Sequence, residues 1–370
     1  PDCESVGLLK MDFLGLKTLS ILKTAVRLVQ TLEPDAPPLD LDSLPLDDPK
    51  TWELFQEGRT VGIFQFESEG MQKYLRMLRP TCIEDLIAMN ALYRPGPMEN
   101  IPTFVRRKHG EEPITYPDPR LKPILENTYG IMVYQEQIMQ VAQVMAGYSL
   151  AEADLLRRAM GKKKKEIMEE QRAIFVRRAI ENGTDPKVAE EVFDTMARFA
   201  EYGFNKSHAA AYSLLAYATA YLKAHYPAAY MAAVLTHHAD DSDKVGFFLQ
   251  EVRSLGIEVL PPCVNTSEVS FSVPSKTQIR FGLGAIKHLG DKLAHLILEE
   301  RKRGGAFRDV YDFAVRMVPH GLNKKAFESL CYAGALDALV PDQRREYLLE
   351  EANRQLILEY ASSYHKASVT

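Results

Sequence analysis

Residues 149–186 read SLAEADLLRRAMGKKKKEIMEEQRAIFVRRAIENGTDP, and this stretch decides the fold class. Ser149 followed three residues later by Glu152 has the spacing of a capping box, which begins a helix. Asn182-Gly183 is typical of a helix C-cap, and Asp185-Pro186 places proline at the favoured first position of the next helix. Working outward, the pattern predicts that residues 134 to about 255 are almost wholly helical.

The N-terminal side begins with another helical pattern. Apolar residues at helical spacing predict a helix over 13–32 that directly follows Asp12 and stops before Glu33-Pro34. From residue 33 to residue 57 there are eight acidic residues, one lysine and five prolines. This composition predicts an extended acidic connector.

Three further patterns complete the expected elements. Thr81 with Glu84 repeats the capping-box spacing, and the helix that follows must end before Pro95-Gly96-Pro97. Residues 257–283 contain two adjacent prolines and several apolar residues in alternation with polar ones, a pattern that favours short strands. The charged amphipathic pattern over 342–360 predicts one helix.

The composition of the 370 residues is that of a folded globular protein. Apolar residues make up 46% and charged residues 26%, so two or three folded units are expected and intrinsic disorder is not. The formal net charge of −5 indicates that a polyanionic partner must be sought in local patches.

The cysteines and the apolar stretches indicate in which cellular compartment the protein is expected. The four cysteines lie far apart, which argues against a zinc knuckle or a disulfide framework and favours a reducing cytosol. The longest uncharged stretch, residues 209–222, is shorter than the roughly 18 apolar residues of a membrane-spanning helix. The chain starts Pro1-Asp2-Cys3-Glu4, with neither an initiator methionine nor a signal-peptide pattern, so a fragment of a longer chain is expected.

The strongest local feature is a basic run. Residues 155–180 hold nine basic and three acidic residues, and the adjacent Arg157 and Arg158 can present planar forks to a phosphate. A solvated basic helix face is the alternative. A Walker loop is excluded, because position 156 is Leu where a glycine is needed and position 163 is Lys where Ser or Thr is needed.

The turn at residues 202–208 is a candidate nucleotide site. Asn205 or Ser207 can cap a helix whose open amides face an anion, and Lys206, His208 and Tyr212 can line a pocket. A structural histidine in a turn is the alternative.

Carboxylates suggest two places for a metal. Asp40-Leu41-Asp42 has the spacing of a two-metal strand, but its proline-rich surroundings favour an exposed connector. Asp12, among apolar residues, is the better candidate, although one carboxylate cannot hold two magnesium ions.

The segment 282–290, GLGAIKHLG, predicts a tight glycine turn before a helix. Its backbone amides and Lys287 can touch phosphates without reading bases, and residues 276–308 carry eight basic against three acidic residues. A turn that serves packing alone is the alternative. The regions around Gly282 and over 322–339 can be two copies of a small helical hairpin.

Five stretches, in order along the chain, resemble the bacterial DNA polymerase III alpha subunit, a family of replicative polymerases. They are LKMDFLGL (9–16), GIFQFES (62–68), YRPGP (93–97), LRRAMGKK (156–163) and YGFNKSHAAAY (202–212). Several long motifs in the right order are far more specific than any one of them.

The resemblance implies roles for individual residues. Asp12 would be the third of three catalytic palm aspartates that bind two Mg²⁺ ions, with Lys10 as its phosphate-contacting neighbour. The fingers residues expected beside the incoming nucleotide are Arg157, Arg158, Asn205, Lys206 and His208. The residues of a helix-hairpin-helix expected to grip duplex DNA are Gly282, Gly284, Lys287 and Gly290.

The resemblance also implies a mainly α fold with the end of an α/β palm at 1–25, helical fingers at 26–260, a helix-hairpin-helix region at 261–340 and a trailing helix and linker at 341–370. The implied reaction is template-directed DNA synthesis from deoxynucleotide triphosphates on primer-template DNA, in the cytoplasm. A sliding clamp and other replisome subunits would bind through regions outside this chain.

Two of the three palm aspartates have no counterpart in this sequence, so the chain alone is expected to be inactive. One rival is a non-catalytic nucleic-acid-binding protein that keeps the helix-hairpin-helix surface. Another is an error-prone paralogue of the same polymerase family.

Overall fold

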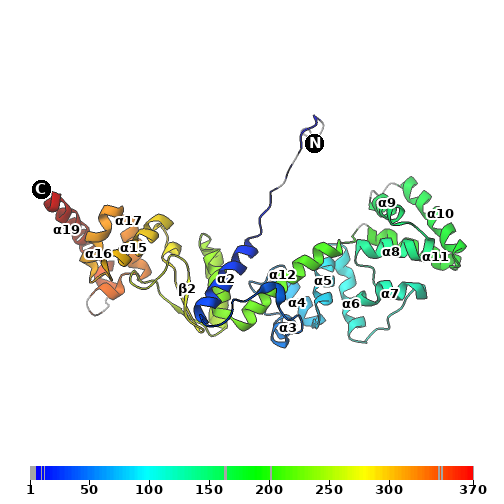
Figure 1. Cartoon of the computed structure of the whole chain (residues 1–370), viewed down its shortest axis with the longest axis horizontal. Coiled ribbons are helices and arrows are strands. Elements are labelled where there is room, and N and C mark those ends of the chain that lie inside the picture. The colour runs from blue at the N-terminus through cyan, green and yellow to red at the C-terminus, as the bar shows by residue number, and fades with distance from the viewer. Residues whose placement is uncertain are drawn as a thin grey trace. The chain divides into compact units, whose positions relative to one another are not determined.

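The computed structural model describes residues 6–9, 11, 13–161, 165–200, 202–340, 342 and 345–369. The chain divides into two compact units. One, here the central unit, is Ser43–Tyr221, and the other, here the flanking unit, joins Pro1–Asp42 to Leu222–Thr370. Helices make up most of both units, as Figure 1 shows, which confirms the mainly α prediction.

The central unit is built almost entirely from helices. They are α3 (Pro49–Gln56), α4 (Glu69–Leu78), α5 (Ile83–Leu92), α6 (Ile101–Lys108), α7 (Lys122–Leu125), α8 (Gln135–Ala146), α9 (Leu150–Gly161), α10 (Lys165–Glu181), α11 (Pro186–Ala200) and the first part of α12 (Lys206–His225). Short 3-10 helices lie at η2 (Pro97–Asn100), η3 (Pro119–Leu121) and η4 (Glu126–Thr128), and η1 (Leu41–Ser43) lies where the chain enters the unit. This confirms the helical prediction for 134 to about 255 within the unit.

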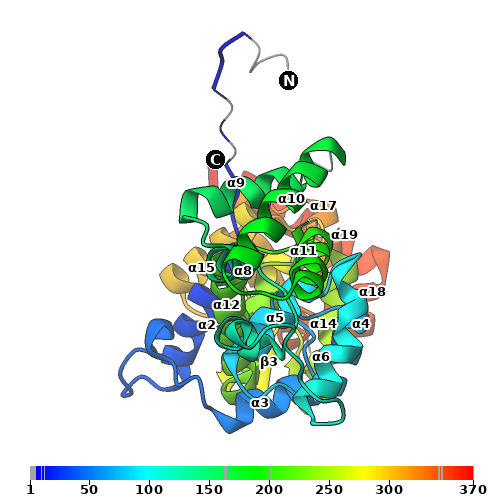
Figure 2. The ribbon, with the colours of Figure 1, turned by 90° about the vertical axis from the view of Figure 1, so that its right-hand side faces the viewer.

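Helices α8 to α11 lie side by side in both views (Figures 1 and 2). Their shared core includes Leu156 and Met160 of α9, Phe175 of α10 and Phe193 of α11, all buried. Because α9 turns its apolar face to this core, its polar residues face outward.

The capping signals in the opening stretch are confirmed. The Ser149 amide donates to Glu152 Oε2 at 2.7 Å, and the Glu152 amide donates to Ser149 Oγ at 3.2 Å, which is a complete capping box. The hydrogen bonds that Glu152 accepts from Ser149 and Arg178 lower the pKa of Glu152 to about 2. Gly183 follows α10 with a φ of 86°, and Asp185 caps α11.

The capping box predicted at Thr81 is displaced by one residue. Helix α5 begins at Ile83 after Cys82, and Asp85 takes the role expected of Glu84 by accepting from the Thr81 amide at 2.9 Å. Because Glu84 and Asp85 are adjacent, the sequence alone could not show which of the two carboxylates would accept the capping hydrogen bond. The helix ends at Leu92, before Pro95, as predicted.

The acidic connector is shorter than predicted. Its last part forms α3, because Asp48 caps the helix by accepting from the Thr51 amide at 2.8 Å. Trp52 and Phe55 then bury their rings in the core. Asp40 and Asp42 are exposed beside or within a 3-10 turn, so they do not share a strand face.

The first part of the flanking unit contains α2 (Lys17–Leu32), α13 (Pro227–Thr236), α14 (Ser242–Ser254) and a small sheet. Its strands, β1 (Glu258–Leu260), β2 (Ser272–Ser275) and β3 (Gln278–Arg280), lie in the order β1-β3-β2, with β1 parallel and β2 antiparallel to β3. The strand prediction for 257–283 is confirmed. Helix α2 ends as predicted but begins at Lys17 rather than directly after Asp12, since Gly15 disfavours a helix and the following Leu16 is extended.

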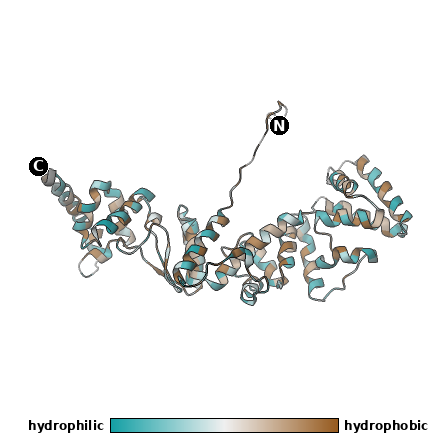
Figure 3. Cartoon of the chain, viewed as in Figure 1, coloured by the Kyte–Doolittle hydropathy of each residue, from teal (hydrophilic) through white to brown (hydrophobic). Residues whose placement is uncertain are grey.

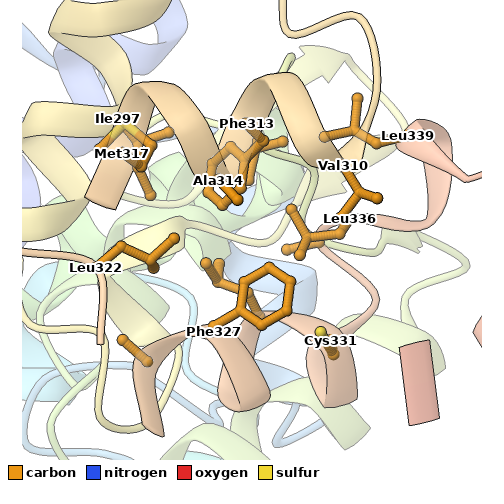
Figure 4. Packing of buried hydrophobic residues seen from close by; sticks show 14 of the residues in the cluster. Ile297, Val310, Phe313, Ala314, Met317, Leu322, Phe327, Cys331, Leu336 and Leu339 are labelled. Carbon is orange, nitrogen blue, oxygen red and sulfur yellow. The ribbon is translucent and has the colours of Figure 1, made fainter. Parts of the chain in front are cut away.

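The second part of the flanking unit contains η5 (Leu283–Ala285), α15 (Asp291–Gly304), α16 (Val310–Met317), η6 (Val318–His320), α17 (Lys324–Ala333), η7 (Asp337–Leu339), α18 (Arg345–Leu349) and α19 (Glu351–Val369). Figure 4 shows Phe313 and Ala314 of α16 facing Phe327 of α17 across the core. Ile357 and Ala361 of α19 are buried in the same core, so this last helix is part of the packed module.

The single helix predicted over 342–360 is wrong. Two helices, α18 and α19, replace it, and the buried Arg354 explains the break. Its Nη1 donates to the carbonyl oxygens of Leu348 and Leu349 at 2.8 and 2.6 Å, which satisfies the open end of α18.

Hydrophobic and hydrophilic residues are interleaved along the helices (Figure 3), as amphipathic helices require. Over the described residues, no helix combines the length and the apolar character needed to cross a membrane.

Candidate nucleotide and nucleic-acid interface

The catalytic and metal-binding candidates cannot be placed. Lys10 and Asp12 lie outside the described residues, as do Lys162 to Lys164 of the basic run. Within the described ranges, no group of three or more His, Cys, Asp or Glu side chains could hold a metal ion. The Mg²⁺ prediction therefore stays a prediction that rests on Asp12.

Arg157 and Arg158 lie on α9, and both contact one carboxylate. Nε and Nη2 of Arg157 donate to Asp154 Oδ1 at 3.1 and 2.9 Å, and Arg158 Nε lies 2.9 Å from Asp154 Oδ2. Their neighbour Leu156 is buried, which turns the arginines away from the core. The Arg158 side chain is 65% exposed and that of Arg157 23%, so one fork is open to solvent and the other is partly covered.

Asp154 is a residue that the sequence analysis missed. The hydrogen bond from Arg157, with the charge of Arg158, lowers the pKa of Asp154. Its spacing, three and four residues before the arginines, was the available signal, because such pairs are neighbours on a helix. A phosphate that approaches these arginines has to compete with this carboxylate or share them with it.

The N-terminus of α12 is already occupied by an anionic group. Asn205 caps the helix, its Oδ1 accepting from the His208 amide at 2.8 Å. The Lys206 amide, however, donates to both carboxylate oxygens of Glu136, at 3.1 and 3.0 Å, and Asn205 Nδ2 donates to the same group at 2.9 Å. Of the amides predicted to face a ligand, that of Lys206 thus faces Glu136 of α8 and that of His208 faces Asn205.

Lys206 is also engaged within the protein. Its Nζ lies 3.4 Å from Glu84 Oε2 and 5.3 Å from the centre of the Tyr134 ring. These contacts tie α12 to α5 and to the start of α8. Of the predicted turn residues, Asn205 and Lys206 therefore have structural partners.

His208 does not share the partners of Asn205 and Lys206, because it contacts aromatic rings beside a small cavity. Its ring lies 5.3 Å from the Phe204 ring and 4.1 Å from the Tyr212 ring, measured between centroids. These three residues line a cavity of about 120 Å³ with Arg94 and Gln65, among others. The contacts given above for Asn205, Lys206 and His208 involve neither Arg157 nor Arg158.

The glycine turn predicted at 282–290 is present, but its glycines differ in position. Gly282 is buried, and a Cβ there would lie 2.5 Å from the Ser270 carbonyl carbon; one at Gly284 would lie 3.0 Å from the Val269 carbonyl oxygen. These two glycines are therefore required for packing. Gly290 is exposed, has a φ of 73° and precedes α15.

The exposed tip of this turn is basic. Lys287 and His288 are both exposed, and desolvation together with the charges of Lys325 and Lys287 lowers the pKa of His288. Lys325 lies in the first turn of α17, which follows a second hairpin in which Gly321 has a φ of 94°. A hairpin that ends in a positive-φ glycine thus precedes each of α15 and α17, but Gly321 lies just before 322–339, the range predicted for the second copy.

Comparison with known proteins extends these observations. Residues 18–183 match the family described as the bacterial DNA polymerase III alpha subunit finger domain. Residues 256–347 match the helix-hairpin-helix motif. The first match includes α9 and its arginines, and the second includes both glycine hairpins.

Curated relatives carry one name. The DNA polymerase III subunit alpha of Thermus aquaticus is 56% identical over 340 residues, which are 90% of this chain and 28% of the relative. Those of Pasteurella multocida and Escherichia coli are 48% and 46% identical, each covering 92% of this chain and 30% of the relative. The chain thus spans less than a third of the length of these relatives. It is similar to a part of the bacterial DNA polymerase III alpha subunits, over a finger domain at residues 18–183 and a helix-hairpin-helix motif at residues 256–347.

Proposed function

We propose that this chain supplies the nucleotide-binding fingers and a duplex-binding module of a template-directed DNA polymerase. The observation that carries the proposal is the 56% identity over 90% of the chain to a DNA polymerase III subunit alpha. The parent reaction would join a deoxynucleotide triphosphate to a primer 3′-end and release pyrophosphate. The polymerase would act in the cytoplasm, with clamp and replisome contacts through other regions.

Arg157 and Arg158 would bind the triphosphate. Asp154 shows that both guanidinium groups can converge on one group of negatively charged oxygens. A triphosphate offers more charge and more acceptors than one carboxylate, so it can displace or share this partner. The arginines would then neutralise negative charge that develops on the leaving pyrophosphate.

The described residues do not fit a two-metal site. Two Mg²⁺ ions need several oxygen ligands and a bridging carboxylate, and no suitable cluster occurs within the described ranges. Asp12 would supply one ligand, and the other two aspartates implied by the resemblance have no counterpart in this sequence. The chain alone would therefore bind substrates without joining them.

Duplex DNA would bind at the exposed basic tip of Lys287, His288 and Gly290, with Lys325 nearby. The amides of Leu283 and Gly284 donate to the Glu268 and Val269 carbonyl oxygens, each at 2.9 Å, so they are not available to a phosphate. The contact would instead come from the tip itself and from the start of α15. Such contacts bind the backbone without reading sequence.

Lys287→Ala is expected to weaken duplex binding equally for unrelated sequences. It should also reduce the slope of log affinity against log salt by about one, because one phosphate contact is lost. Fluorescence anisotropy with two unrelated duplexes at several salt concentrations measures both quantities.

Lys302→Ala is the matched control, because Lys302 is an exposed lysine at the other end of α15. It should leave the salt slope closer to that of the wild type. A Lys287→Ala protein with unchanged affinity and slope would remove this hairpin from the DNA surface.

A further inference from the structure

Arg94 lies in a cavity of the central unit that the fingers motifs did not account for. The cavity measures about 120 Å³ and is lined by Gln65, Met71, Asn90, Tyr93, Arg94, Phe204, His208, Ala209 and Tyr212. It is smaller than the roughly 300 Å³ of a site for a complete drug-sized ligand. A single small group of a larger ligand is the occupant that its size admits.

The Arg94 guanidinium is held by stacking rather than by a counter-charge. Its central carbon lies 3.4 Å from the centre of the Phe204 ring. Within the part of the chain that the structure describes, its side chain forms no hydrogen bond or ion pair. By contrast, Arg107 and Arg120 of the same unit pair with Glu112 at 3.0 Å and Asp118 at 2.7 Å.

The stacked position leaves the donors of Arg94 free for another group. A guanidinium presents five N–H donors and accepts none, so it requires acceptors wherever water is reduced. Partial burial also lowers the pKa of Arg94. These properties favour an anion with several oxygens as the partner.

The other residues that line the cavity are also compatible with a bound anion. The described lining residues carry side-chain amides (Gln65 and Asn90), hydroxyls (Tyr93 and Tyr212) and an imidazole (His208), but none of them is Asp or Glu. Asn90 Nδ2 is 2.9 Å from Ser213 Oγ, which fixes that amide. The lining therefore offers hydrogen-bond donors and no negative charge to repel an anion.

The backbone that carries Arg94 is firmly constrained. Arg94 donates its amide to the Leu92 carbonyl at 2.8 Å and accepts from the Met98 amide at 3.1 Å. Gly96 has a φ of 102°, and a Cβ there would lie 2.5 Å from the Tyr202 ring. Gln65, which also lines the cavity, has a φ of 66°, which is uncommon for a residue other than glycine.

We infer that Arg94, stacked on Phe204 beside His208, binds a phosphate group in this cavity. The inference rests on the proposed function, because it adds one residue to the substrate-binding surface of the fingers. The phosphate belongs either to a nucleotide or to the backbone of a nucleic-acid strand, and both present the same oxygens to the guanidinium. Neither Arg157 nor Arg158 takes part in this contact.

Isothermal titration calorimetry on the 370-residue chain tests the inference with three probes: inorganic tripolyphosphate, dATP and a short single-stranded oligodeoxynucleotide. Arg94→Gln is expected to weaken tripolyphosphate binding about tenfold or more, since a charge-assisted fork is lost. Arg106→Gln is the matched control, because Arg106 is an arginine of the same unit that already pairs with Glu112. It should bind all probes like the wild type.

The other two probes identify the source of the phosphate. Loss of dATP affinity alone assigns the cavity to the nucleotide, and loss of oligonucleotide affinity alone assigns it to a strand. Wild-type affinity of Arg94→Gln for every probe would overturn the inference, as would a wild-type chain that binds no tripolyphosphate.

A second measurement does not depend on the folding of a variant. Tripolyphosphate should shift the ring NMR signals of His208 in the wild-type chain and leave those of His109, a histidine outside the cavity lining, unchanged. Unshifted His208 signals at saturating ligand would overturn the inference. Because neither measurement requires turnover, a failure here is separate from a failure of the polymerase proposal.

Discussion

Replacing Arg157 and Arg158 together by alanine in the parent polymerase is expected to lower kcat/KM for nucleotide incorporation by about 10²- to 10⁴-fold, because two charged donors leave the triphosphate. Both side chains converge on Asp154 in this structure, which shows that they can share one anionic group. Steady-state primer extension at varied nucleotide concentration measures the effect, and duplex affinity should stay unchanged.

Two further variants sharpen this test. Arg172→Ala with Arg177→Ala removes the half-buried Arg172 and the exposed Arg177 of the neighbouring α10 and should change kcat/KM little. Asp154→Asn removes the competing carboxylate while keeping its size, so nucleotide affinity should rise. If the Arg157 and Arg158 double variant instead loses duplex affinity as much as kcat/KM, the basic run is a DNA-contacting surface.

Phe313→Ala is expected to destabilise the helix-hairpin-helix module by about 3–5 kcal/mol, because a fully buried ring is removed from a packed core. Phe313 is 0% exposed, and its ring lies 4.9 Å from that of Phe307 in an edge-to-face pair. Figure 4 shows the Phe313 side chain in the core between α16 and α17. The cavity left behind would loosen both hairpins that precede α15 and α17.

Hydrogen exchange of individual amides is the appropriate measurement, because a chain with two compact units need not unfold in a single step. Protection should fall in α15 to α17 and persist in α8 to α11. Leu356→Ala is the control, since Leu356 is an apolar residue on α19 that is 54% exposed. Unchanged protection in Phe313→Ala would contradict the packing described for this core.

Local signals in the sequence predicted local structure well. The capping box at Ser149 and Glu152, the glycine after α10 and the Asp-Pro start of α11 depend on contacts within a few residues, and each is present. The failures arise where burial in the core decides. The break between α18 and α19 depends on the buried Arg354, which donates to carbonyl groups of α18, and α3 gains its stability from the burial of Trp52 and Phe55.

The candidate site was predictable only in part. The sequence identified Arg157, Arg158 and His208 as polar residues in suggestive motifs. It could not show that Glu136 would cap α12, since the two segments are far apart in the chain. Arg94 was also missed as a site residue, because only the fold brings it over Phe204.

Primer extension with magnesium and all four deoxynucleotides tests the central claim most directly. It compares this 370-residue chain with a chain lengthened upstream to include the two further palm aspartates that the family resemblance implies. The account predicts extension only by the longer chain. Sustained extension by the 370-residue chain would contradict the requirement for those carboxylates, and activity in neither chain, with duplex DNA still bound, would contradict the polymerase role and favour a non-catalytic DNA-binding protein.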